Sequence, residues 1–255
     1  MIYDKLPVAL LSALSTEREG TTNAIIARYL VTHSHELHDV TIKGVASACN
    51  VGMGSVSRFC RDVGFRDFDE LRSALGRTSK LFTVASCEDN LSDRMEEHAS
   101  YIGQSLQHVA STLDVRMLHS LVEDLHKYQT VFVCGMLKAQ AAAIDLQVDL
   151  LMMGKYVETC VGYAEQLRRI AAAREDDLVL VFSYTGSYFE SSDLKNVLSR
   201  IDRPRIWLIA GTKKPQPEYV YSCLSFESDL EQLTHPFQLE MAAAIISQEY
   251  ARAQK

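Results

Sequence analysis

Two rhythms of hydrophobic and polar residues divide the chain. Up to about residue 128 the apolar residues recur every three or four positions, the spacing that gives a helix one buried face. Beyond that point short apolar runs, such as residues 130–134 and 178–182, alternate with helical stretches. Strands of this kind normally lie parallel in a sheet that is covered on both faces. The pattern therefore predicts an all-α front part joined to an α/β back part, a three-layer fold with a parallel sheet.

Two short helices are expected on either side of residue 50. Their apolar stripes are Ile42, Val45, Ala46 and Cys49, and Val56, Phe59, Cys60 and Val63. Between them lies Asn-Val-Gly-Met-Gly at residues 50–54, where Asn or Gly can adopt the positive φ that ends a helix. Two helices joined by such a turn form a helix-turn-helix. An earlier helix, with Thr22 as its cap, is expected to pack across the pair.

A long amphipathic helix is predicted over residues 91–113, and a further helix follows it with Asp114 as its cap. The back part then has strands expected at residues 130–134, 156–160, 178–182, 205–210 and 219–226, and helices at about 139–153, 163–174, 189–201 and 237–253. Ligands of open parallel sheets bind beyond the carboxyl ends of the strands. That rule points to residues 135–139 and 183–188.

Charge is divided unevenly along the chain. The net charge of −7 argues against a uniformly basic nucleic-acid coat, but residues 1–80 carry 10 Lys/Arg against 9 Asp/Glu and are the less acidic part. The six cysteines show no C-x-x-C pair and no metal-finger spacing, so we expect reduced, buried thiols and no metal. The apolar runs are far shorter than the ~20 residues needed to cross a bilayer. We expect a cytoplasmic protein with no membrane partner.

The second helix of the turn motif offers polar side chains on the face that its apolar stripe leaves outward. Ser55, Ser57, Arg58 and Arg61 lie there near its start, and Lys43 on the first helix adds a positive charge. In helix-turn-helix proteins this part of the second helix enters the major groove, where Arg suits the acceptors of guanine and Ser can contact base or phosphate. The alternative interpretation is a solvated basic face of an ordinary helix pair.

The segment 45–65, followed by Phe68 and Leu71, resembles the DNA-binding domain of the RpiR-type bacterial transcription regulators. Its most specific part is Ser-Arg-Phe-Cys-Arg-x-x-Gly-Phe at residues 57–65. Those regulators join this module to a carboxy-terminal sugar isomerase (SIS) domain, and the order of helices and then α/β structure is similar to that arrangement. One departure is Gly52, where the family usually has a capping Ser; Gly caps with only a small loss.

Residues 183–190 resemble the S-x-S-G-x-T-x-E loop of SIS domains. A hydroxyl-rich turn between a strand and a helix presents donors beside unpaired backbone N–H groups, which suits an anion such as phosphate. Ser183, Thr185, Gly186 and Ser187 keep the pattern, while Tyr188 stands where the family has Thr. Without the resemblance, a helix-capping role for these hydroxyls would be the favoured interpretation.

The first loop of the SIS pattern is altered. Residues 135–139 stand where the family shows G-x-G-x-S, and Gly135 alone is retained. Leu137 restricts close backbone approach and Ala139 removes a hydroxyl. Lys138 brings a charge that could face an anion or could be an ordinary surface residue.

No residue is assigned a catalytic role. Sugar-phosphate isomerisation needs a base near the carbon that loses its proton, and Glu190 and His235 are candidates by residue type alone. Neither lies in a motif that fixes the geometry, so an isomerase is the alternative and a non-enzyme is expected.

The sequence thus predicts a DNA-binding transcription regulator without cofactor. Its expected domains are a helix-turn-helix domain over residues 1–80, a linker helix over 81–113 and a SIS domain over 114–255. Its expected partners are a double-stranded DNA operator, a small phosphorylated sugar as effector, and further copies of itself in a homodimer or homotetramer. A third interpretation is a regulator whose SIS domain only dimerises. The sequence names neither the sugar nor the operator.

Overall fold

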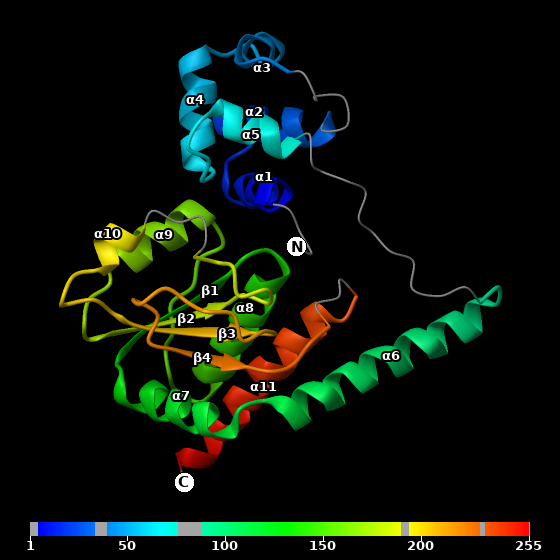
Figure 1. Ribbon diagram of the computed structural model, residues 1–255, viewed down its shortest axis with the longest axis vertical. Helices are drawn as coiled ribbons and strands as arrows, with labels where there is room; N and C mark the ends of the chain where they lie inside the picture. The colour runs from blue at the N-terminus through cyan, green and yellow to red at the C-terminus, as the bar shows by residue number, and fades with distance from the viewer. Residues whose placement is uncertain (1–4, 34–39, 76–87, 190–193, 230–232, 255) are drawn as a thin grey trace. The chain divides into compact units, whose positions relative to one another are not determined.

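The computed structural model describes residues 5–33, 40–75, 88–189, 194–229 and 233–254 (Figure 1). The chain divides into two compact units. Residues 3–81 and 161–168 make the first unit, and residues 82–160 and 169–255 make the second. The expected fold class, a helical front followed by an α/β unit with a parallel sheet, is confirmed.

The helices of the first unit gather their apolar faces into one core. They are α1 (Lys5–Thr16), α2 (Thr22–Thr32), α3 (Ile42–Ala48), α4 (Met53–Asp62) and α5 (Phe68–Leu75). Phe59 of α4 and Leu71 of α5 are fully buried in this core. The cap of α2 is Thr21, whose hydroxyl accepts a hydrogen bond from the N–H of Ala24, so the expected cap Thr22 is instead the first helical residue.

The turn between α3 and α4 is built by backbone hydrogen bonds around one left-handed residue. Asn50 has a φ of 52°, as expected for a residue that ends a helix, and the next N–H, of Val51, donates to Ala46 O at 2.9 Å. The end of α4 repeats this geometry: Gly64 has a φ of 86° and Phe65 N donates to Cys60 O at 2.8 Å. Each helix therefore ends in a Schellman-type turn, and the chain leaves α3 directly into α4.

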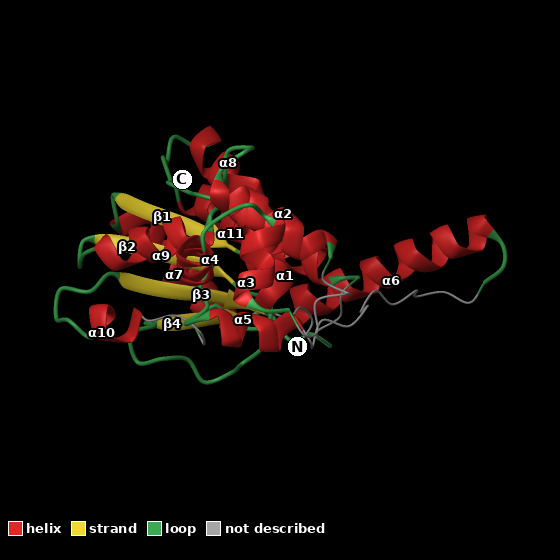
Figure 2. Cartoon of the chain, turned by 90° about the horizontal axis from the view of Figure 1, so that it is seen from above, coloured by secondary structure: helices red, strands yellow, loops and turns green. Residues whose placement is uncertain are grey.

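The second unit is a parallel sheet between helices. Its strands, in the spatial order β1-β2-β3-β4 that Figure 2 shows, are β1 (Thr130–Gly135), β2 (Asp177–Phe182), β3 (Arg205–Ala210) and β4 (Ser222–Ser225). Its helices are α6 (Leu91–Thr112), α7 (Val115–Lys127), α8 (Lys138–Met152), α10 (Leu194–Leu198) and α11 (His235–Ala253). One further helix, α9 (Tyr163–Ala172), is divided between the units, with residues 163–168 in the first and 169–172 in the second. Asp114 caps α7 through the N–H groups of Arg116 and Met117, as predicted.

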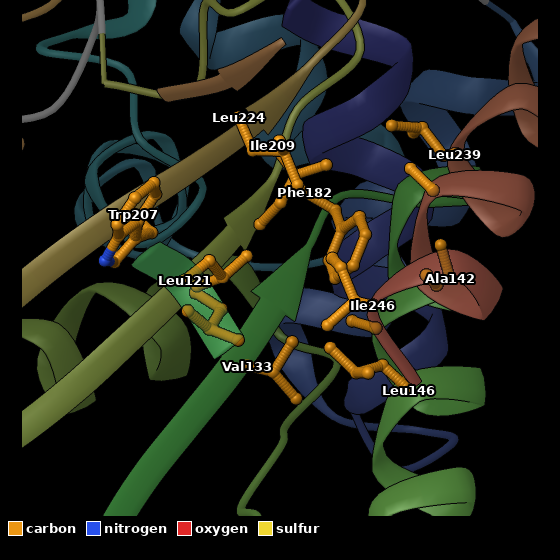
Figure 3. Packing of buried hydrophobic residues seen from close by; sticks show 14 of the residues in the cluster. Leu121, Val133, Ala142, Leu146, Phe182, Trp207, Ile209, Leu224, Leu239 and Ile246 are labelled. Carbon is orange, nitrogen blue, oxygen red and sulfur yellow. The ribbon is translucent and has the colours of Figure 1, made fainter. Parts of the chain in front are cut away.

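One face of the sheet carries the larger core. Trp207 and Phe182 on this face pack with Leu121 of α7, Leu146 of α8 and Ile246 of α11 (Figure 3). The residues that alternate with them along the strands are also buried on the opposite face, as the near-continuous apolar strands predicted.

The expected strand at residues 156–160 is reduced to a single bridge. Glu158 pairs in parallel with Phe132 of β1, and its backbone exchanges hydrogen bonds of 2.9 Å with Val131 and Val133. The segment around Glu158 pairs with one side of β1, and β2 pairs with the other side. Between Glu158 and β2 the chain therefore crosses from one side of β1 to the other. The topological switch point therefore falls at the carboxyl ends of β1 and β2, where open sheets bind ligands.

The remaining differences from the expected elements are at their ends. The strand expected at 219–226 is the shorter β4, preceded by a turn in which Val220 N donates to Pro217 O. The helix α6 follows its predicted range closely and packs against α11 within the second unit, with Val109 buried. Within the described residues, no helix has an apolar stretch long enough to cross a bilayer.

Candidate nucleic-acid interface and ligand loops

The polar face of α4 is set by the burial of its apolar stripe. Val56, Phe59 and Cys60 point into the core, and at 3.6 residues per turn this leaves Arg58 and Arg61 on the opposite side. Both arginines are exposed. Two shorter side chains of the same helix, Ser55 and Ser57, are half-buried, and Lys43 is exposed on α3.

The positive charges on this face have no ion-pair partner in the part of the chain that the structure describes. No carboxylate of the described residues forms an ion pair with Lys43, Arg58 or Arg61. By contrast, other arginines of the same unit are paired, such as Arg28 with Glu19 and Arg72 with Asp69. The face thus presents cations and hydroxyls that remain available to an outside partner.

The loop after β2 is a tight turn. Gly186 has a φ of 68°, and its N–H donates to Ser183 O at 2.8 Å. The hydroxyl of Ser183 accepts a hydrogen bond from Tyr188 N at 3.2 Å, and the hydroxyls of Thr185 and Ser187 lie 2.5 Å apart. The four residues that keep the SIS pattern are therefore held together by their own hydrogen bonds.

Burial differs among these loop residues. Thr185 and Ser187 are half-buried, whereas Ser183 is only 7% exposed. The ring of Tyr188, which stands in place of the family's Thr, is buried, and its hydroxyl oxygen accepts a hydrogen bond from Cys134 Sγ at 3.7 Å. Tyr188 thus lies against β1 beneath the loop, and its bulk is accommodated inside the unit.

The loop after β1 approaches α8 closely. A Cβ atom added to Gly135 would lie 2.7 Å from the backbone carbonyl carbon of Ala139, so the retained glycine is required by packing. The N–H of Gly135 donates to Gln140 Oε1 at 3.0 Å, and Gln140 Nε2 donates to Thr159 Oγ1 at 2.8 Å. Gln140 thereby positions this loop, a role that nothing in the sequence pattern indicated.

Leu137 has a backbone conformation that is unusual for a residue with a side chain. Its φ of 52° and ψ of −112° are typical of glycine rather than of a residue with a large side chain. Lys138 follows as the first residue of α8, and its side chain is exposed.

The two loops lie side by side. Gly135, the last residue of β1, is in register with Phe182, the last residue of β2. Both loops therefore leave the same edge of the sheet on neighbouring strands, at the switch point.

The structure describes only one of the two candidate catalytic bases. Glu190 lies outside the described residues. His235 is buried at the start of α11, where its ring centroid lies 4.9 Å from that of Tyr184. The hydroxyl of Tyr184 donates to Gln238 Oε1 at 2.7 Å, so His235 belongs to a packed cluster behind the loop. Within the described residues, no three side chains of His, Cys, Asp or Glu are grouped to hold a metal ion.

Comparison with known proteins identifies the first unit. Residues 10–80 match the model of the helix-turn-helix domain of the rpiR family. An uncharacterised HTH-type transcriptional regulator of Caldanaerobacter subterraneus subsp. tengcongensis is 23% identical over 174 residues, which cover 65% of this chain and 61% of the relative. The match thus spans about three fifths of that relative's length.

Solved structures share the fold. NanR of Vibrio vulnificus, complexed with ManNAc-6P, superposes with a TM-score of 0.55 at 17% identity and covers 97% of this chain and 92% of its own. A candidate phosphosugar isomerase of Bacteroides fragilis, involved in capsule formation, gives a TM-score of 0.54 at 16% identity, over 65% of this chain and 92% of its own. At these identities the likeness concerns architecture.

Proposed function

We propose that the chain is a sequence-specific DNA-binding transcription regulator. The basis of this proposal is the helix-turn-helix domain of the rpiR family that it carries over residues 10–80. The observation that carries the proposal is the face of α4. Arg58 and Arg61 stand exposed, with no carboxylate partner among the described residues, on the helix that follows the turn at Asn50. Helices in this position enter the major groove, where arginine binds guanine or phosphate.

Each polar residue of this interface has a distinct expected role. Arg58 and Arg61 bind base edges or phosphates, Ser55 and Ser57 donate to the backbone or to bases, and Lys43 contacts phosphate from α3. Phosphate contacts release counterions, so binding weakens with added salt. We infer that the operator is roughly palindromic, because a symmetric dimer places two reading helices about 34 Å apart on one side of the duplex.

Fluorescence anisotropy of the full chain with DNA from upstream of its own gene tests this proposal. We expect salt-dependent binding that exceeds binding to scrambled DNA. Arg58→Ala should cost about 1–3 kcal/mol if the side chain contacts a base, and it should lower the salt slope by about 1 if it contacts a phosphate.

The matched control is Arg28→Ala, which removes an exposed arginine of the same unit that is paired with Glu19. It should leave the affinity and the salt slope close to those of the original chain. Equal losses for both variants, or no binding at low salt, would contradict the assignment of α4.

For the second unit we propose binding of a small phosphorylated sugar at the two loops after β1 and β2. Their register at the switch point and their hydroxyl and backbone groups support this site. Gly135, Lys138, Ser183, Thr185, Gly186, Ser187 and Tyr188 are the residues assigned to it. The ManNAc-6P in the structure of NanR, which shares the fold, is in line with a phosphosugar as the class of ligand.

Thermal shifts with a panel of sugar phosphates test this site. Ser183→Ala should abolish the rise in melting temperature that the active sugar phosphate produces. Ser247→Ala is the matched control because Ser247 is another buried serine, located on α11, whose hydroxyl donates to Ala243 O. An unchanged ligand shift in Ser183→Ala would remove Ser183 from the site.

We further propose that the ligand acts by linkage rather than by being converted. A sugar phosphate that binds one arrangement of a homodimer or homotetramer more tightly shifts the population that is competent for DNA. His235 is buried against Tyr184, which favours regulation over catalysis. Operator affinity that is unchanged at saturating ligand would contradict coupling, and turnover of arabinose-, fructose- or glucosamine-phosphates would establish the isomerase alternative.

A further inference from the structure

The first residue of α4 is an apolar side chain that the fold leaves outside its core. Met53 is 53% exposed, whereas Val56, Phe59 and Cys60 of the same helix are buried. Among the described residues, Met53 is neither a member of the apolar cluster of this unit nor one of the partly buried residues that pack against it. Burial within the chain therefore does not account for a long apolar side chain at this position.

The glycines on both sides of Met53 are also not required by the fold. Gly52 has an ordinary φ of −75°, and Gly54 is not among the residues with positive φ. A Cβ atom added to either one would meet nothing within 4 Å. Gly54 lies in the first turn of α4, where glycine is less favourable than alanine, and it relieves no contact among the described residues. The two glycines leave the surface around Met53 open to close approach by another molecule.

The positive charge of α4 determines which class of molecule binds near Met53. Arg58 and Arg61 stand on the same helix without a carboxylate partner among the described residues, so the surrounding face attracts an anionic partner. A DNA duplex is anionic along its backbone and presents one apolar group in the major groove, the C5-methyl group of thymine.

We propose that Met53 is a specificity-determining residue that packs against the methyl group of one thymine in each half of the operator. This inference rests on the proposed DNA-binding function and assigns it a base. The first turn of the second helix meets base edges in helix-turn-helix proteins. The unbranched, polarisable methionine side chain adapts to an apolar group of fixed position. The arginines and serines bind polar groups. Met53 favours thymine over pyrimidines that lack the C5-methyl group, such as cytosine and uracil.

A scan of the operator with deoxyuridine tests the proposal, because replacing thymine by deoxyuridine removes only the methyl group. The operator is first selected in vitro with the full chain. One contacted thymine is expected in each half-site, and replacing it in a single half-site should weaken binding about fourfold, which corresponds to the ~0.8 kcal/mol of one buried methyl group. In Met53→Ala the same replacement should have no effect, whereas Met53→Leu should retain most of the difference.

The matched control is Met95→Ala, which removes another exposed methionine, located on α6 in the second unit. It should keep the fourfold effect of deoxyuridine at the same thymine. Specific binding without any thymine whose methyl effect depends on Met53 would overturn this inference and leave DNA binding intact. Absence of any sequence-specific binding would overturn the proposed function itself.

Discussion

Gly135 lies against Ala139 so closely that a Cβ atom on Gly135 would be 2.7 Å from the Ala139 backbone. The contact joins the end of β1 to the first turn of α8, and neither side can yield without moving backbone. Gly135→Ala should therefore destabilise the second unit by about 1–3 kcal/mol, the usual cost of overpacking a core. The chain's one tryptophan, Trp207, is buried in this unit, so its fluorescence during urea unfolding measures the loss.

Gly103→Ala is the opposite case and serves as the control for Gly135→Ala. Gly103 lies inside α6, and an added Cβ would meet nothing within 4 Å. We expect this substitution to stabilise the helix by about 0.5–1 kcal/mol. Similar stabilities for the two alanine variants would show that the close approach at Gly135 is relieved at little cost.

Removing the side chain of Leu137 is expected to stabilise the second unit. Its φ of 52° and ψ of −112° are unfavourable for leucine. Strain of this kind costs about 1–3 kcal/mol, which exceeds the entropic cost of glycine. Leu137→Gly should therefore stabilise the second unit by roughly 1 kcal/mol, measured by the same fluorescence. Leu137→Ala retains a Cβ and the strain, and it should not be stabilising. A destabilised Leu137→Gly would mean that leucine packing outweighs the strain.

Asn50 determines the turn between α3 and α4. Its φ of 52° is accessible to asparagine and glycine but costs other residues about 1–2 kcal/mol. Asn50→Ala should lower the stability of the first unit by about 1 kcal/mol, while Asn50→Gly should leave it nearly unchanged. Circular dichroism during thermal unfolding checks both variants. Equal effects of alanine and glycine would contradict the role assigned to the left-handed backbone.

Alkaline pH should destabilise the first unit through Cys60. Burial raises the pKa of this thiol to about 11 from its ordinary value of 9.0. The native thiol stays protonated between these two values while the unfolded thiol ionises, so the unfolded state binds fewer protons and stability falls as pH rises. The expected slope is about 1.4 kcal/mol per pH unit from this group, and it flattens above the native pKa.

Two variants separate the thiol from the packing that surrounds it. Cys60→Ala removes the titrating group, so its stability should decline less steeply between pH 9 and 11. Val63→Ala removes buried volume from the same core without removing a thiol, and it should keep the original slope. Parallel slopes in all three proteins would refute the contribution of Cys60.

Local pattern was sufficient for much of the fold and for the exposed polar face of α4. The cap at Asp114 and the left-handed turn at Asn50 depend on residue type within one helical turn, so both could be predicted. The outward position of Arg58 and Arg61 follows from the 3.6-residue period once the apolar stripe of α4 is recognised. The assignment of these residues to DNA remains a proposal.

What the sequence alone determined is therefore the order of elements, their faces and the residue types at the sheet's carboxyl edge. Tertiary structure alone decided that Tyr188 lies against Cys134 of β1, that Gln140 holds Gly135 and Thr159, and that the expected strand at 156–160 makes one bridge. Such contacts join segments that are far apart in the chain. Which of them form depends on how well the shapes of the side chains fit together in a close-packed core. Periodicity within one segment records which face is buried, whereas the identity of the neighbour across the core depends on every segment that packs there.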